Sequence, residues 1–152
     1  MIKEFVNLTD KEVELMFKAP VLVCILIAGA DGNIDRKELK EAIAQSQKLH
    51  KSSLVSYLKE VSLDFEDKLK VLLQSYPYDA TERNTMLIEE LGQLNGIWGK
   101  IDMDFAAQFY HMLRELAERI AASSGGLWGM KTVTGEEAKL LQLSMISEPS
   151  KN

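Results

Sequence analysis

The fold of this chain is decided by an uninterrupted apolar stretch near its start, VLVCILIA at residues 21–28. A helix that is apolar all the way round has no face suited to water and is therefore buried. The stretch is too short to cross a bilayer, which needs about 20 residues. We expect it to form the central helix of the protein. Because Pro20 suits the first position of a helix, we expect this helix to begin there, after a separate short helix that ends at Phe17.

Apolar residues recur at helical spacing along the rest of the chain, and no segment alternates as a strand does. The spacing predicts helices at 9–17, 20–28, 35–49, 52–61, 64–76, 80–98, 102–120 and 138–146. We therefore predict an all-α fold of about seven helices in one compact bundle. The bundle should be a single domain over residues 1–152, with its core at about 10–146 and a frayed tail from Ser147.

Several of these helices carry start and stop signals. A cap residue is followed by Glu three positions later, as in a capping box, at three places: Thr9 with Glu12, Asp35 with Glu38, and Thr134 with Glu137. We also expect Asp64 to cap the helix at 64–76 and Asp102 to start the helix at 102–120. Because Pro77 cannot continue a helix and pushes Tyr76 into an extended conformation, the helix before them should end there.

The segment after the apolar stretch, ADGNIDRKEL at residues 30–39, resembles the second half of a calcium-binding EF-hand loop. Gly32 takes the sixth loop position, which needs a sharp turn. Asp31, Asp35 and Glu38 fall at positions five, nine and twelve, where oxygen ligands belong. The first half of the loop lacks such ligands, which excludes a tight calcium site. Two interpretations stay open: a weak, open site for Ca²⁺ or Mg²⁺, or helix capping alone.

A similar pattern occurs a second time near the end of the chain. Residues 27–38 and 121–137 both contain small residues that end a helix, a glycine turn, a branched apolar residue, an oxygen cap and a later Glu. The second copy is longer, and it has Gly125 where the first has Asp31. The repeat indicates two helix-turn-helix units related by pseudo-symmetry.

These two motifs resemble those of the TerB-like family, all-helical domains named for a tellurite-resistance protein. The resemblance covers about residues 10–146 and is carried by residues 30–38 and 124–137. It implies a compact helical fold, a link to tellurite resistance or general stress response, and binding of a divalent cation by the acidic turns. Gly125 departs from the family pattern. The implied ion site consists of Asp31, Asp35 and Glu38, with Glu137 as a candidate fourth ligand.

The composition limits the classes of function. Hydrophobic residues make up 46% of the 152 and charged residues 27%, which is ordinary for a globular protein that needs no disulfide or metal. A net charge of −5 disfavours nucleic acid and anionic membranes as partners, because both select Lys and Arg. The segment before the apolar stretch carries four acidic residues against three lysines, whereas a signal peptide starts with a positive segment, so we expect a cytoplasmic protein. Cys24, the single cysteine, should be a small core side chain.

The sequence offers little for catalysis. The only two histidines, His50 and His111, lie far apart, and neither has a partner at the spacing of a metal site. Phosphate-binding loops and nucleophile elbows are missing too, so we expect a binding protein rather than an enzyme. Apart from weakly bound Ca²⁺ or Mg²⁺, no cofactor is indicated.

One further segment is a candidate for function, the glycine-rich loop GGLWGM at residues 125–130. Leu127, Trp128 and Met130 stand between its glycines, and Trp and Met are common at protein interfaces. The loop either presents these side chains to a protein partner or folds Trp128 back over the core, since large exposed apolar patches are rare on monomers. In the first case the protein is an interaction scaffold that needs no metal.

Overall fold

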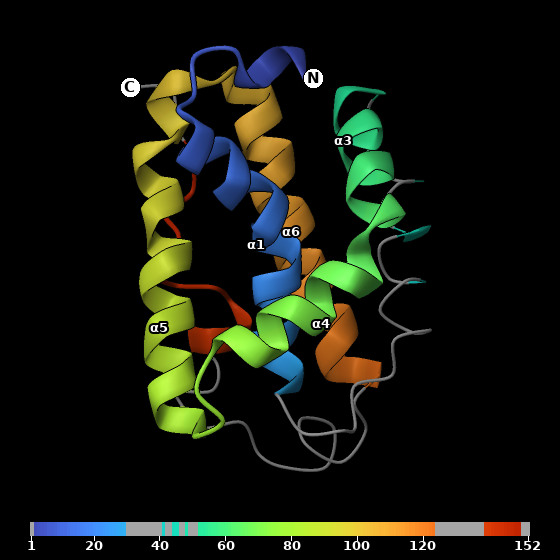
Figure 1. Cartoon of the computed structure of the whole chain (residues 1–152). Coiled ribbons are helices and arrows are strands. Elements are labelled where there is room, and N and C mark those ends of the chain that lie inside the picture. Colours follow the sequence, from blue (N-terminus) through green and yellow to red (C-terminus); the bar gives the residue numbers. More distant parts are fainter. Residues whose placement is uncertain are drawn as a thin grey trace.

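The computed structural model describes residues 2–29, 52–123 and 139–149, together with Glu41, Ala44, Gln45 and Lys48. Within this part of the chain every regular element is a helix, which confirms the predicted all-α fold (Figure 1). The elements are η1 (Lys3–Phe5), α1 (Asp10–Ala28), α3 (Ser52–Leu63), α4 (Phe65–Ser75), α5 (Ala80–Gly92), η2 (Gln93–Gly96), η3 (Trp98–Lys100) and α6 (Met103–Ser123). Among the described helices, none combines the length and the apolar character needed to cross a membrane.

Helix α1 is the centre of the arrangement. It packs against α6 and also contacts α4 and α5, while α3 packs on α6. In the view of Figure 1, α5 lies on one side of α1 and α3 on the other. Residues 21–27 are all buried, as the apolar stretch predicted. The face of α6 that carries Phe105, Phe109 and Leu116 is buried as well, in agreement with its apolar spacing.

One prediction about α1 is wrong: the helix does not begin at Pro20 but runs unbroken from Asp10 to Ala28. Proline has no N–H, so inside a helix it leaves the carbonyl four residues earlier without its donor. Here that carbonyl belongs to Met16, and the hydroxyl of Tyr57 in α3 donates to it. Because a side chain from another helix supplies the missing hydrogen bond, the buried chain can continue as a helix through the proline.

Among the described residues, the predicted helix caps are confirmed at two places and wrong at one. The Thr9 hydroxyl accepts the Glu12 N–H at 3.2 Å, and the Glu12 carboxylate accepts the Thr9 N–H at 2.9 Å, which completes the capping box of α1. Asp102 accepts an N–H in the first turn of α6 at 3.0 Å. Asp64 directly precedes α4 but does not cap it, because its ψ of 22° is not the extended conformation of a capping residue. Its carboxylate lies 4.0 Å from the Lys68 ammonium instead.

Six aromatic rings pack together in the core where α1, α3, α6 and the N-terminal segment meet. They are Phe5, Phe17, Tyr57, Trp98, Phe105 and Phe109. Most neighbouring rings meet edge to face, an arrangement that adds roughly 0.5–1.5 kcal/mol per pair beyond burial. Because Phe5 belongs to η1, the first residues of the chain are part of the core.

The last helix ends earlier than predicted. Within the described residues from 139 onward, only 139–141 are helical, and a turn follows where the prediction extended the helix to Ile146. The N–H of Leu143 donates to the Leu140 carbonyl and the N–H of Ser144 to the Lys139 carbonyl, both at 3.0 Å. These are the two bonds of a Schellman motif, in which one residue has a positive φ. Leu143 takes that position with a φ of 52°, where glycine is usual, because its side chain is fully buried.

The prediction of a frayed tail from Ser147 is wrong for residues 147–149. The side-chain amide of Asn95 in η2 accepts the Ser147 N–H at 2.7 Å and donates to the Met145 carbonyl at 3.0 Å. The indole N–H of Trp98 donates to the Ser147 carbonyl at 2.9 Å. Pro149 is buried. These contacts fasten the segment to η2 and η3, so it belongs to the folded core.

Candidate functional site

The residues predicted to bind an ion lie outside the part of the chain that the structure describes. They are Asp31, Asp35, Glu38 and Glu137. The predicted contact residues Leu127, Trp128 and Met130 lie outside it too, as do His50 and the cap Thr134. The ion site and the exposure of Trp128 therefore stay predictions.

The structure does describe the two helices that lead into these segments. Helix α1 ends at Ala28, just before the acidic turn, and α6 ends at Ser123, just before the glycine-rich loop. The two helices pack against each other and run in the same direction, so they finish at the same end of the bundle (Figure 1). The helices that precede the acidic turn and the glycine-rich loop therefore both end at the same end of the bundle.

Gly29 sets the direction in which the chain leaves α1. Its φ of 89° and ψ of 177° lie in a region that essentially only glycine adopts. Its N–H donates to the Ile25 carbonyl at 2.8 Å and closes the last turn of the helix. A side chain at this position would strain the backbone, so the small residue before the acidic turn is required by geometry.

A polar cluster joins α1, α5 and the segment between α4 and α5. One carboxylate oxygen of Glu90 accepts from the Tyr76 hydroxyl, and the other lies 3.0 Å from the Lys18 ammonium. Burial, and after it the hydrogen bond to Glu90, raises the pKa of Tyr76. The phenol therefore keeps its proton and acts as a hydrogen-bond donor rather than a base. The cluster is suited to tying three elements together.

Two other side chains of types that often carry chemistry, Cys24 and His111, lie in the described part of the chain. Cys24 is fully buried in α1, and burial raises the pKa of its thiol, which makes it a poor nucleophile and confirms it as a core side chain. His111 is exposed on α6, with its ring 5.4 Å from that of Tyr110. Within the described ranges, no three side chains of His, Cys, Asp or Glu come close enough to hold a metal ion.

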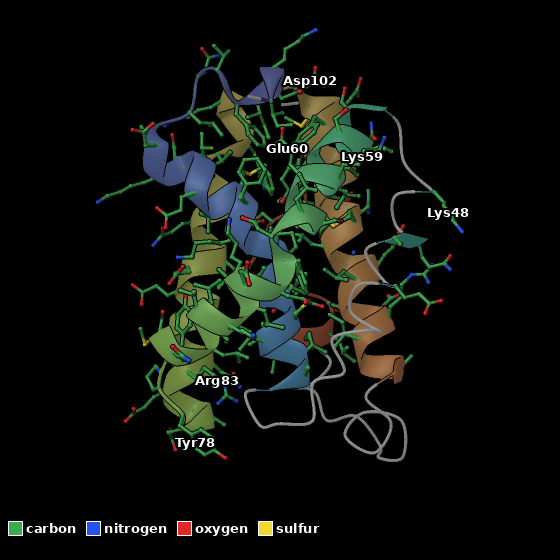
Figure 2. The ribbon with its side chains drawn as sticks, turned by 45° about the vertical axis from the view of Figure 1, so that its right-hand side comes forward. Lys48, Lys59, Glu60, Tyr78, Arg83 and Asp102 are labelled. Atoms are coloured by element: carbon green, nitrogen blue, oxygen red, sulfur yellow. The ribbon has the colours of Figure 1, made fainter. Side chains whose placement is uncertain are left out.

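Arg83 was not predicted as a site residue, yet it is the one charged residue that is buried in the described part of the chain, with 7% of its surface exposed. Its Nη1 donates to the Tyr78 carbonyl at 2.8 Å, whereas its buried Nε–H has no acceptor among the residues that the structure describes. Figure 2 shows both residues at the N-terminal end of α5. The sequence did contain a signal, because Arg83 stands one turn before Leu87 and two before Leu91 on the apolar face of the helix.

A protein of Methanothermobacter thermautotrophicus, described as "Uncharacterized protein ORF11'", is similar to this chain. The two are 31% identical over 127 residues, which cover 80% of each chain. This chain belongs to the same family as that protein. No family model matches the chain, and no solved structure matches it. The description of the relative names no activity, so the function is argued from the chain itself, and the resemblance to the TerB-like family stays a prediction.

Proposed function

We propose that the protein is a non-enzymatic accessory or binding module of TerB-like type that works in the cytoplasm, in tellurite resistance or a related stress response. Its working part is the acidic turn, in which Asp31, Asp35 and Glu38 form a weak site for a divalent cation. Glu137, from the second copy of the motif, supplies a fourth carboxylate. The repeated motif and the acidic, all-helical character of the chain support this proposal.

The observation that carries the proposal is the parallel packing of α1 and α6 (Figure 1). A helix of 19 residues, the length of α1, is about 28 Å long at 1.5 Å per residue. If the two helices were antiparallel, the two motifs would start about that far apart, and they could not share a site. Because both helices finish at the same end, carboxylates of the two motifs can belong to one ion site.

The chemistry of the proposed ligands determines which ion they suit. All are carboxylates, which are hard oxygen ligands, so the site should prefer Ca²⁺ or Mg²⁺ over Zn²⁺. Three or four carboxylates do not fill a coordination shell of six to eight oxygens, so water and backbone carbonyls complete it. The dissociation constant should then be about 10⁻⁴ to 10⁻³ M.

Titration of millimolar Ca²⁺ or Mg²⁺ into ¹⁵N-labelled protein tests this site. We expect saturable shifts of the amides of residues 31–38 in the wild type, and none in Asp31→Asn. Asp67→Asn is the matched control, because Asp67 is exposed in the first turn of α4, and it should behave as the wild type. Asp35→Ala should lower stability by about 1 kcal/mol with or without the ion, through loss of a helix cap. If these amides do not shift in the wild type, capping alone explains the motif.

The role in stress is tested separately from the ion. Expression of the wild-type chain in a tellurite-sensitive bacterial host should raise survival on tellurite, and Asp31→Asn should raise it less. A panel of metals and metabolites, screened by melting temperature, would identify any other ligand that binds the native state. Equal survival with and without the wild-type chain would contradict the proposed link to tellurite.

The alternative function is a protein interaction scaffold that uses the glycine-rich loop without a metal. It is favoured by the pattern of Leu127, Trp128 and Met130 between glycines. Acrylamide quenching of Trp128, measured as the difference between the wild type and Trp128→Phe, decides whether this side chain is exposed. Strong quenching supports the scaffold, whereas a protected Trp128 shows that it covers the core and contradicts it.

A further inference from the structure

The segment at residues 143–149, here called the tail, is held by contacts of the kind that bind peptides. Asn95 accepts the Ser147 N–H at 2.7 Å and donates to the Met145 carbonyl at 3.0 Å. The Trp98 indole donates to the Ser147 carbonyl at 2.9 Å. All three bonds run from a side chain of η2 or η3 to a main-chain atom of the tail. Such bonds recognise a backbone whatever its side chains are, and they give affinity in many peptide-binding proteins.

The residues of the core that contact the tail form a stripe. In a 3₁₀-helix, side chains three residues apart lie on the same face. Gly92 ends α5, Asn95 lies in η2 and Trp98 in η3, so these residues follow one another at that spacing. A Cβ atom added at Gly92 would stand 3.7 Å from the Met145 carbonyl oxygen, so the tail passes this position too. We call Gly92, Asn95 and Trp98 the Asn95 stripe.

The tail has a matching spacing of its own. Every third residue of it is buried, namely Leu143, Ile146 and Pro149, whereas Ser147 is exposed. Residues 147–149 form neither helix nor strand, and in Figure 1 the tail, coloured red, lies beside α5. The tail thus offers the stripe a backbone without regular structure, together with an apolar side chain and a proline three positions later. This is the chemistry of a short peptide ligand.

We infer that the Asn95 stripe is a recognition site for a peptide segment with an apolar residue and a proline three positions later, and that the tail is its resident, autoinhibitory ligand. An amide has both an acceptor and donors, so one Asn side chain can bind two main-chain groups of such a segment. Because the tail belongs to the same chain, it competes for the stripe at an effective concentration of about millimolar. A segment of a partner protein therefore occupies the stripe once the tail is released. The stripe contains no residue of the acidic turn or of the glycine-rich loop, so this inference goes beyond the proposed function.

The test measures binding of a fluorescently labelled peptide of residues 143–149 to the full chain by fluorescence anisotropy. Ser147→Pro in the full chain removes the N–H that Asn95 accepts, which loosens the tail, so this variant should bind the peptide saturably. Ser147→Ala is the matched control, because it keeps the N–H and changes only an exposed side chain. It should bind the peptide no better than the wild type. Equal binding by Ser147→Pro and Ser147→Ala would overturn the inference.

The same assay shows whether the stripe is the place of binding. Asn95→Ala, added to Ser147→Pro, removes the acceptor and the donor that hold the peptide backbone, so binding should be lost. Gln93→Ala is the matched control, because Gln93 is exposed in the same helix, and it should leave binding unchanged. If both variants bind the peptide equally, the stripe is not the site.

A measurement on the wild type decides the matter even if Ser147→Pro does not fold. A releasable tail opens without unfolding of the core, so the Ser147 amide should exchange its hydrogen faster than the amides of residues 21–27 in α1. Asn95→Ala should speed this exchange further, whereas Gln93→Ala should not. A Ser147 amide that exchanges only as slowly as the core would show that the tail is not released, and it would overturn the inference.

Discussion

Tyr57 and Pro20 form a pair whose energetic coupling can be measured. Tyr57→Phe keeps the ring and its packing but removes the hydroxyl that donates to the Met16 carbonyl. Tyr57 and Met16 are both fully buried, so in this variant the Met16 carbonyl loses its donor and no water replaces it. A buried polar group without a partner costs about 1–3 kcal/mol, and we expect Tyr57→Phe to lower the free energy of unfolding by that amount.

The structure predicts that this cost depends on the proline. In Pro20→Ala the chain regains an N–H four residues after Met16, and this N–H can make the ordinary helical bond to the same carbonyl. Tyr57→Phe should then cost less than about 0.5 kcal/mol. The coupling energy between the two positions should be about 1–2 kcal/mol.

Urea unfolding followed by far-UV circular dichroism, applied to the wild type, both single variants and the double variant, measures the coupling. Tyr110→Phe is the control, because the Tyr110 hydroxyl has only a long contact of 3.5 Å with Arg114. It should cost little with or without the proline. If Tyr57→Phe costs the same in both backgrounds, the hydroxyl does not replace the missing donor and the reasoning is refuted.

Three further predictions concern the core and the start of α1. Leu143→Ala should lower the free energy of unfolding by about 2–5 kcal/mol. Leu143→Gly should lower it by no more than that, because glycine adopts a φ of 52° without strain. A clearly larger loss of stability for the glycine variant in urea unfolding would contradict this. Leu26 is 4% exposed, so Leu26→Asp buries an unpaired charge and should cost more than about 4 kcal/mol, seen as loss of the helical dichroism signal; a folded variant of normal stability would refute the central position of α1. Two hydrogen bonds lower the pKa of Glu12. The larger effect comes from the Lys100 ammonium, 2.8 Å from the carboxylate, and the next from the Thr9 N–H. Because the folded state has the lower pKa, this stabilisation is present at neutral pH and is lost as the pH falls below about 4. The melting temperature of the wild type should exceed that of Glu12→Gln at neutral pH and equal it in acid, and a gap that persists in acid would show another cause.

Helix positions could be predicted where two local signals agree. The start of α6 has Asp102 as a cap, and its apolar residues recur at helical spacing, so both its first turn and its buried face follow from residues close together in the sequence. The start of α1 is similar, since Thr9 and Glu12 form their capping box within one turn. Such signals can be recognised from sequence because the groups that interact are only three or four residues apart.

The predictions failed where a contact between distant residues decides the local structure. Pro20 favours a helix start when only its own backbone is considered, but the Tyr57 hydroxyl in another helix makes an internal position tolerable. Ser147 has the composition of a frayed end, but Asn95 and Trp98 each make one hydrogen bond to its backbone. Asn95 also donates to the Met145 carbonyl. Sequence spacing does not reveal the Tyr57 hydroxyl or the side chains of Asn95 and Trp98 as partners, because they lie far along the chain from the backbone groups that they bind.

Arg83 shows why a buried charge can be missed when only the spacing of charged residues is considered. The spacing rule pairs Asp79 with Arg83, yet the rule assumes that both side chains are equally exposed. For Asp79 to pair with the guanidinium, its carboxylate would have to leave water, which costs several kcal/mol. As a cap it stays hydrated and still stabilises α5 by about 1 kcal/mol. The cap is therefore favoured over the ion pair, and no carboxylate of the described residues pairs with Arg83. The sequence indicates the burial of Arg83 only through its position on the apolar face of α5, one turn before Leu87, and this signal concerns packing rather than charge.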